Sequence, residues 1–82
     1  MTWGELAMLL CPREEALRRR WAEIRRTRKH QHPYWGALDW CAAQGLVPKG
    51  TKPGAPVTAL PEDRFAPVSA FTRREVYRAY KG

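Results

Sequence analysis

The sequence predicts a mainly α-helical fold, a small helix-turn-helix domain of three to four helices. A short two-stranded β-wing is an optional addition to this fold. Residues 2–26 contain a short apolar-striped segment and a longer basic one, separated by Cys11-Pro12. Residues 33–44 and 72–81 repeat apolar positions at helical spacing. The 82 residues form one small domain. We expect a helical core at 2–45, a proline- and glycine-rich loop or wing at 46–70, and a C-terminal helix at 71–82.

The first expected helix follows Thr2, whose hydroxyl suits an N-cap. Glu5 lies three residues later, as in a capping box, where its carboxylate reaches back to the cap amide. An apolar stripe then recurs at helical spacing, formed by Trp3, Leu6, Ala7 and Leu10. Pro12 ends this helix and suits the first turn of the next.

The second expected helix runs from Pro12 to Lys29 and has two different faces. Leu17, Trp21 and Ile24 share an apolar side that is expected to pack in the core. The opposite side carries Glu15, Arg18, Arg19, Ala22 and Arg26. Residues 13–29 hold +5 of the chain's net charge of +7, so the positive charge is concentrated in this helix.

A third helix is expected from Pro33 to Gln44, with Gly45 as its C-terminal stop. The following loop is rich in proline and glycine, and Val57–Leu60 and Phe65–Phe71 are candidates for paired strands around the turn residues 61–64. Thr72 and Glu75 form a second capping box, with Phe71 and Val76 at the spacing of a hydrophobic staple. This pattern predicts a final helix to about Lys81.

About residues 2–26 resemble the second and third helices of Myb/SANT-type and related bacterial helix-turn-helix domains. The resemblance lies in Trp3-Gly4-Glu5-Leu6-Ala7, then Leu10, and in the segment from Glu14 to Trp21. It implies that Trp3 and Trp21 are core residues and that base edges face Arg18, Arg19, Ala22 and Glu23. The family places another helix before this pair, so here the third core helix is expected from residues 33–44.

Double-stranded DNA is therefore the expected partner. The sequence pI near 10.1 favours a polyanion, and arginine matches the acceptor pair of guanine in the major groove. Phosphate contacts are expected from Arg28, Lys29, Lys49 and Lys52. The complete set of predicted DNA-binding residues is Arg18, Arg19, Ala22, Glu23, Arg25, Arg26, Arg28, Lys29, Lys49 and Lys52.

Other classes of function find less support in the sequence. Cys11, His30, His32 and Cys41 fit no standard zinc spacing, and no catalytic motif or phosphate loop is present. We therefore expect no metal, no cofactor and no enzymatic activity. The sequence contains no stretch long and apolar enough for a membrane span and no signal-peptide pattern, so a cytoplasmic location with reduced, buried cysteines is expected.

The expected function is that of a small phage or mobile-element transcriptional regulator that inserts a basic recognition helix into the major groove. The alternative is a phage-type inhibitor that docks on a host protein, such as RNA polymerase or a CRISPR effector, through exposed aromatic residues. RNA binding is less favoured, because the sequence contains no single-strand-binding module. Oligomeric state is left open.

Overall fold

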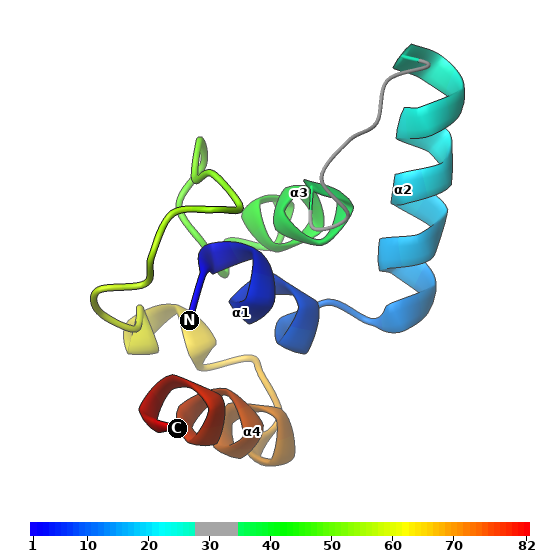
Figure 1. Cartoon of the computed structure of the whole chain (residues 1–82). Coiled ribbons are helices and arrows are strands. Elements are labelled where there is room, and N and C mark those ends of the chain that lie inside the picture. The colour runs from blue at the N-terminus through cyan, green and yellow to red at the C-terminus, as the bar shows by residue number, and fades with distance from the viewer. Residues whose placement is uncertain (28–34) are drawn as a thin grey trace.

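The computed structural model is mainly helical and describes residues 1–27 and 35–82, with the side chains of residues 16, 20, 23–27 and 35 left out. Figure 1 shows how its elements are arranged. They are α1 (Trp3–Leu10), α2 (Arg13–Thr27), α3 (Trp35–Ala43), a 3-10 helix η1 (Glu62–Phe65) and α4 (Ala70–Lys81). The predicted helical fold class is thereby confirmed. No helix in the described ranges has the length and apolar character required to cross a membrane.

Thr2 is the N-cap of α1, as predicted. Its Oγ accepts a hydrogen bond from the backbone amide of Glu5 at 3.2 Å. The Glu5 carboxylate in turn accepts from the Thr2 hydroxyl at 3.2 Å, whereas the sequence predicted the cap amide as the donor. The Thr2 hydroxyl therefore accepts from the Glu5 amide and donates to the Glu5 carboxylate.

The proline- and glycine-rich loop lies across the start of α1 and satisfies amides that a helix leaves unpaired in its first turn. The amide of Trp3 donates to the carbonyl of Ala55 at 3.0 Å, and that of Gly4 to the carbonyl of Pro53 at 2.9 Å. The amide of Val57 donates to the carbonyl of Met1 at 2.9 Å. These bonds tie a loop without regular structure to the helical core.

The predicted β-wing is wrong. Residues Glu62–Phe65 form the helix η1, and residues 46–70 contain no strand apart from the single bridge between Thr2 and Pro56. A hairpin would have placed Phe65 on an edge strand, whereas the tight turn of η1 buries it completely. Burial of this large aromatic side chain outweighs the weak strand preference of a segment that also contains Pro67.

Helix α3 ends at Ala43, one residue before the predicted Gln44, and Gly45 closes it as the predicted stop through a Schellman arrangement. The amide of Leu46 donates to the carbonyl of Cys41 at 2.8 Å, and that of Gly45 to the carbonyl of Ala42 at 3.1 Å. Gly45 has φ +75°, in the left-handed region. Leu46 and Cys41 are both buried, which adds the hydrophobic contact that accompanies this motif.

Gly45→Ala is expected to lower the free energy of unfolding by about 1–2 kcal/mol, the usual cost of a Cβ in the left-handed region. An added Cβ would meet no atom within 4 Å, so the loss would be conformational rather than steric. Chemical denaturation measures it. Gly54→Ala is the matched control, because Gly54 also has open space but no positive φ. Equal effects of the two substitutions would contradict this explanation.

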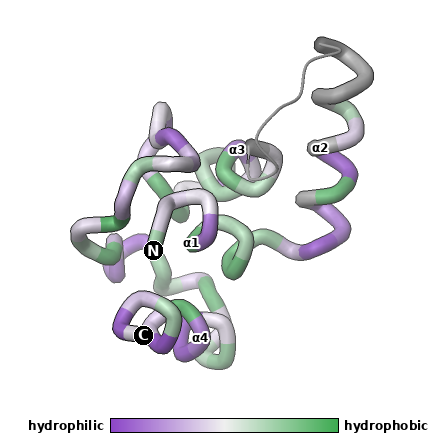
Figure 2. Tube along the Cα trace, in the orientation of Figure 1, coloured by the Kyte–Doolittle hydropathy of each residue, from purple (hydrophilic) through white to green (hydrophobic). Residues whose placement is uncertain are grey.

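The helices pack in the spatial order α4, α1, α3, α2, because α1 contacts both α3 and α4, and α3 contacts α2. Figure 2 shows mainly hydrophobic residues along α1 and α3, and alternating polar and apolar residues along α2. The centre of the core contains the fully buried side chains of Leu6, Cys41, Val47, Phe65 and Val76.

Helix α4 begins earlier than predicted. Its N-cap is Ser69, whose Oγ accepts from the Thr72 amide at 3.2 Å, so Thr72 is in the first turn and is not the cap. Phe71 is 71% exposed, and the predicted staple between Phe71 and Val76 does not form. Val76 is buried as predicted, and the Tyr80 hydroxyl donates to the carbonyl of Thr58 at 3.1 Å.

Helix α2 presents a different side to the core from the one predicted. Leu17 is 45% exposed and Trp21 is 60% exposed, so their predicted packing in the core is wrong. Arg19, which is half a turn away from both, pairs with Asp39 of α3. Among the described side chains of α2, Arg19 makes an ion pair with α3, whereas Leu17 and Trp21 are exposed.

Candidate nucleic-acid interface

The solvent-facing side of α2 combines a cation with apolar side chains. Trp21 is 60% exposed, the Arg18 side chain is 65% exposed, and Leu17 and Ala22 are also exposed. Helical spacing places Leu17, Arg18 and Trp21 on adjoining positions of one surface. In Figure 1, α2 stands at the edge of the molecule beyond α3.

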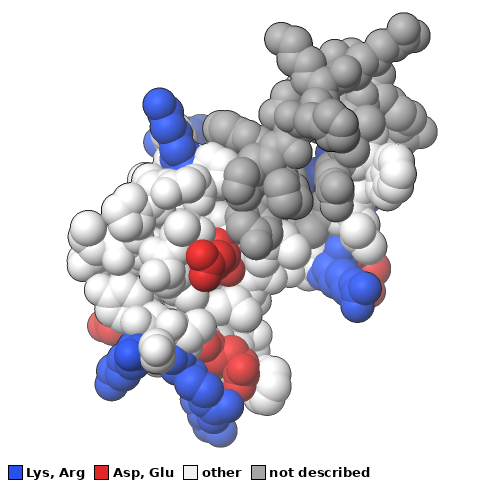
Figure 3. Space-filling view, in the orientation of Figure 1, with Lys and Arg blue, Asp and Glu red and all other residues white. Residues whose placement is uncertain are grey.

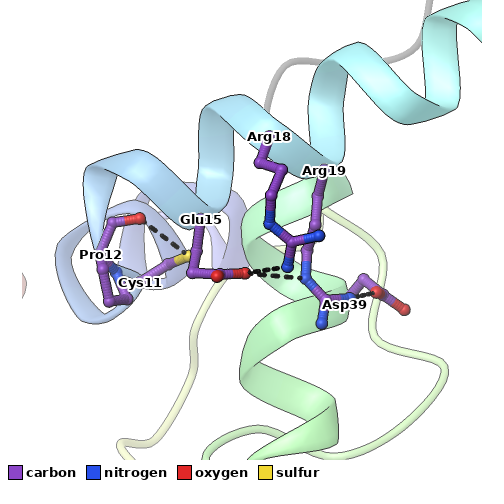
Figure 4. A network of polar contacts seen from close by, with 6 residues as sticks. All are labelled: Cys11, Pro12, Glu15, Arg18, Arg19 and Asp39. Atoms are coloured by element: carbon purple, nitrogen blue, oxygen red, sulfur yellow. Dashed lines mark hydrogen bonds and ion pairs between the residues drawn. The ribbon is translucent and has the colours of Figure 1, made fainter.

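A network of ion pairs attaches α2 to α3, as Figure 4 shows. Arg18 Nη2 lies 2.6 Å from Glu15 Oε2, and Arg19 Nε lies 3.5 Å from the same oxygen. The Arg19 guanidinium also donates through Nη1 to the carboxylate of Asp39. Glu15 thus contacts two arginines, and Arg19 is held between carboxylates of two helices.

The hydrogen bond from Arg18, followed by its positive charge and the contacts of Arg19, lowers the pKa of Glu15 below its ordinary value. A lowered carboxyl pKa stabilises the folded state above the unfolded value and loses that effect as the pH falls through the folded value. The ion pairs that Glu15 makes within α2 should therefore weaken only in acid, as the pH falls below the ordinary range of a carboxyl group.

Arg18 and Arg19, which the sequence predicted as equivalent base contacts, have different surroundings. Arg18 has one exposed carboxylate partner, and exposed pairs of this kind contribute little to stability. Arg19 has a side chain only 30% exposed and spans from Glu15 to Asp39. Arg18 is available to an incoming partner, whereas Arg19 fixes the position of α2.

The structure describes only some of the other predicted DNA contacts on α2 and directly after it. Ala22, which was predicted to face base edges, is exposed next to Trp21. Glu23, Arg25 and Arg26 belong to α2, but their side chains lie outside the description. Arg28 and Lys29 lie outside the described residues, as do His30 and His32.

Lys49 and Lys52 lie on the loop that follows α3, where both are exposed. They line a groove of about 470 Å³ between α3 and residues 47–52, together with Asp39 and Leu38. Asp39 is thus shared between this groove and the network on α2. Figure 3 shows cations over this loop, at the base of α2, and over α4.

The sequence reasoning missed two features of this surface. Asp39 was not identified, because nothing in the local sequence pairs it with a residue 20 positions earlier. Trp21 was assigned to the core, although the strong basic character of its helix was a sign that α2 would lie at the periphery. Both features depend on the orientation of α2 about its own axis, which determines the side chains that face α3.

The two cysteines are buried thiols, as predicted, and lie in the core. Burial, followed by the nearby Cys11, raises the pKa of Cys41 to about 12. No group of three metal-ligating side chains occurs within residues 1–27 and 35–82. A thiol with a raised pKa is a poor nucleophile, so Cys41 has a packing role.

Cys41 is expected to resist alkylation by iodoacetamide at pH 8 in the folded protein, because it is fully buried and the thiolate is a trace species below a pKa of about 12. Mass spectrometry of peptides from native and urea-unfolded samples provides the measurement. Rapid modification of Cys41 in the native sample would contradict its assignment to the closed core.

The candidate interface therefore consists of the exposed side of α2, the ion pairs that fix α2 on α3, and the lysine-bearing loop beyond α3. A partner that meets Arg18 and Trp21 also approaches the apolar surface of Leu17 and Ala22. Comparison with protein-family models, with curated proteins and with solved structures finds no match to this chain.

Proposed function

We propose that the protein is a small DNA-binding transcriptional regulator of phage or mobile-element type, which inserts α2 into the major groove in the manner of a helix-turn-helix domain. The observation that carries this proposal is the exposed side of α2, where a 65% exposed Arg18 adjoins Trp21 and Ala22. The short Cys11-Pro12 connection between α1 and α2 and the net charge of +7 support it. It acts in the cytoplasm without metal or cofactor.

In this proposal, Arg18 exchanges its exposed carboxylate partner for the two acceptors of a guanine. A guanidinium matches the O6 and N7 atoms of guanine with two parallel hydrogen bonds. Ala22 and Trp21 supply apolar contact to a thymine methyl group. Glu15, Arg19 and Asp39 keep α2 in a fixed orientation on α3 while Arg18 reads the base.

Phosphate contacts complete the interface and set its register on the duplex. Lys49 and Lys52 are the exposed candidates on the loop beyond α3. Arg25 and Arg26 near the end of α2, and Arg28 and Lys29 directly after it in the sequence, add further positive charge. These residues would contribute affinity that is independent of base sequence.

Methylation interference tests the proposed groove. After selection of a bound site from random duplexes, guanine N7 methylation within the site should weaken binding, because N7 lies in the major groove and is an acceptor for arginine. Arg18→Ala should lose part of this sensitivity. Binding that is unaffected by N7 methylation at every guanine would contradict insertion of α2 into the major groove.

A second candidate function is supported by the same exposed apolar residues. Trp21 is an exposed aromatic residue of the kind that anchors protein interfaces, and Leu17 adds apolar surface one turn away. A host protein of the nucleic-acid machinery, such as RNA polymerase or a CRISPR effector, is the partner in this alternative. Such a complex would depend on salt far less than a phosphate-contacting one. Salt dependence therefore distinguishes the two candidates.

A further inference from the structure

The outer side of α4 has an exposed aromatic ring at one end and cations along its length. Phe71 is 71% exposed, and Arg74, Arg78 and Lys81 follow it at helical spacing and are also exposed. This set, which we call the α4 stripe, lies opposite the buried Val76. Figure 3 shows the cations gathered over α4. The stripe spans about 15 Å along the helix axis.

The charge of the α4 stripe is only weakly compensated. Arg78 Nη1 lies 3.6 Å from Glu75 Oε1, and the two side chains are 73% and 39% exposed. An ion pair of this length and exposure is easily exchanged for another anion. Residues 70–81 contain four cations and one carboxylate. A polyanion is therefore the partner class that fits this surface.

A membrane surface fits the α4 stripe less well than a nucleic acid does. A helix that binds in a membrane interface must insert an apolar face, but the apolar face of α4 is already packed on the core through Val76. Phe71, at 71% exposed, is the most exposed large apolar residue of α4, ahead of Tyr80 at 36%. The stripe thus offers one ring for stacking and several positive charges.

We propose that the α4 stripe binds a single-stranded segment of nucleic acid. Phe71 stacks on an unpaired base, and Arg74, Arg78 and Lys81 contact the backbone phosphates. Aromatic rings beside a track of cations bind single strands without strong sequence preference, because every base has a face that can stack. Duplex bases are already stacked on one another, so a duplex would leave Phe71 without a partner.

This second site is separate from the interface on α2. The packing order α4, α1, α3, α2 places two helices between them, and Figure 1 shows α4 and α2 on different sides of the molecule. The single-strand site therefore does not depend on the proposed duplex binding. Substitutions on α4 should leave duplex binding by α2 in place, and Arg18→Ala should leave single-strand binding in place.

Fluorescence anisotropy with a labelled oligo-dT of about 12 nucleotides tests the proposal, since this length suits a small single-strand site. Phe71→Ala should weaken binding roughly tenfold or more, whereas Phe71→Tyr, which keeps the ring, should bind nearly as the natural protein does. A matching oligo-rU reports whether the strand can be RNA as well as DNA, and binding of either supports the site.

The cations are tested by the salt dependence of the same binding. The double variant R74Q/R78Q should reduce the slope of log affinity against log salt by roughly 1.4, at about 0.7 per single-strand phosphate contact. The matched control is R64Q/R73Q, which removes the same charge away from the α4 stripe and should retain more of the slope. Thermal unfolding of each variant confirms that it is folded.

Several outcomes would overturn the proposal. Equal oligo-dT binding by the Phe71→Ala and Phe71→Tyr variants would show that Phe71 does not stack on a base. Equal salt-dependence slopes for R74Q/R78Q and R64Q/R73Q would show that binding depends on net charge and not on the α4 stripe. Loss of oligo-dT binding in Arg18→Ala alone would place the site on α2. Binding to phosphatidylserine vesicles that R74Q/R78Q abolishes, without oligonucleotide binding, would assign the stripe to a membrane. Absence of duplex binding would count against the function proposed for α2 only.

Discussion

Phe65→Ala is expected to lower the free energy of unfolding by about 3–5 kcal/mol, because removal of a fully buried phenyl ring loses its burial and leaves a cavity. Phe65 lies in the same core as Leu6, Val47 and Val76. A domain of 82 residues has a total stability on the order of 4–12 kcal/mol. The substitution should therefore remove a large share of the stability at 25 °C, as urea denaturation followed by circular dichroism would show.

Phe71→Ala is the matched control for this prediction, since it removes the same ring from a site that is 71% exposed. Its effect should be within about 0.5 kcal/mol. If Phe65→Ala cost no more than Phe71→Ala, Phe65 would not be at the centre of the core and the turn of η1 would need another explanation.

Arg18→Ala is expected to weaken binding to a selected DNA site by about 1–3 kcal/mol, or roughly 5- to 150-fold, and to relax the preference at one base pair. The physical reason is loss of a bidentate contact to guanine from an exposed side chain. Because its ion pair with Glu15 is exposed, the melting temperature should change little. Anisotropy with the selected site and with single-base variants of that site measures both effects.

Arg19→Ala is the informative comparison. The sequence predicted the same base-contacting role for Arg18 and Arg19, whereas the structure pairs Arg19 with Glu15 and Asp39. We expect it to lower the melting temperature and to weaken binding to all sequences alike, through a loosened α2. If Arg19→Ala instead altered base preference and Arg18→Ala did not, the assignment of roles on α2 would be reversed.

The sequence predicted those elements of the fold whose signals are local. Thr2 as a cap and Gly45 as a stop each depend on residues within one or two turns, and both are confirmed. At the start of α4, two local signals compete, because Ser69 and Thr72 each lie before a suitable first turn. Ser69 is the cap, which lengthens the helix by a turn while Val76 stays buried and Phe71 stays exposed.

The rest could not be predicted, because it depends on contacts between distant residues. The pairing of Arg19 with Asp39 joins residues that are 20 positions apart, and nothing in the local sequence of α2 predicts it. An amphipathic pattern would bury Leu17 and Trp21, but α2 docks at the edge of the molecule on a polar contact. Phe65 is buried by the 3-10 helix η1, and the proline-rich sequence around it did not predict this helix.

The central claim is that α2 binds duplex DNA, and the most direct test is binding of the purified protein to a labelled random-sequence duplex at about 50 and 200 mM salt. Each phosphate contact contributes roughly 0.9 to the slope of log affinity against log salt. We predict measurable binding at the lower concentration and a steep loss at the higher one. Absence of binding at low salt would contradict the claim and favour a protein partner anchored by Leu17 and Trp21.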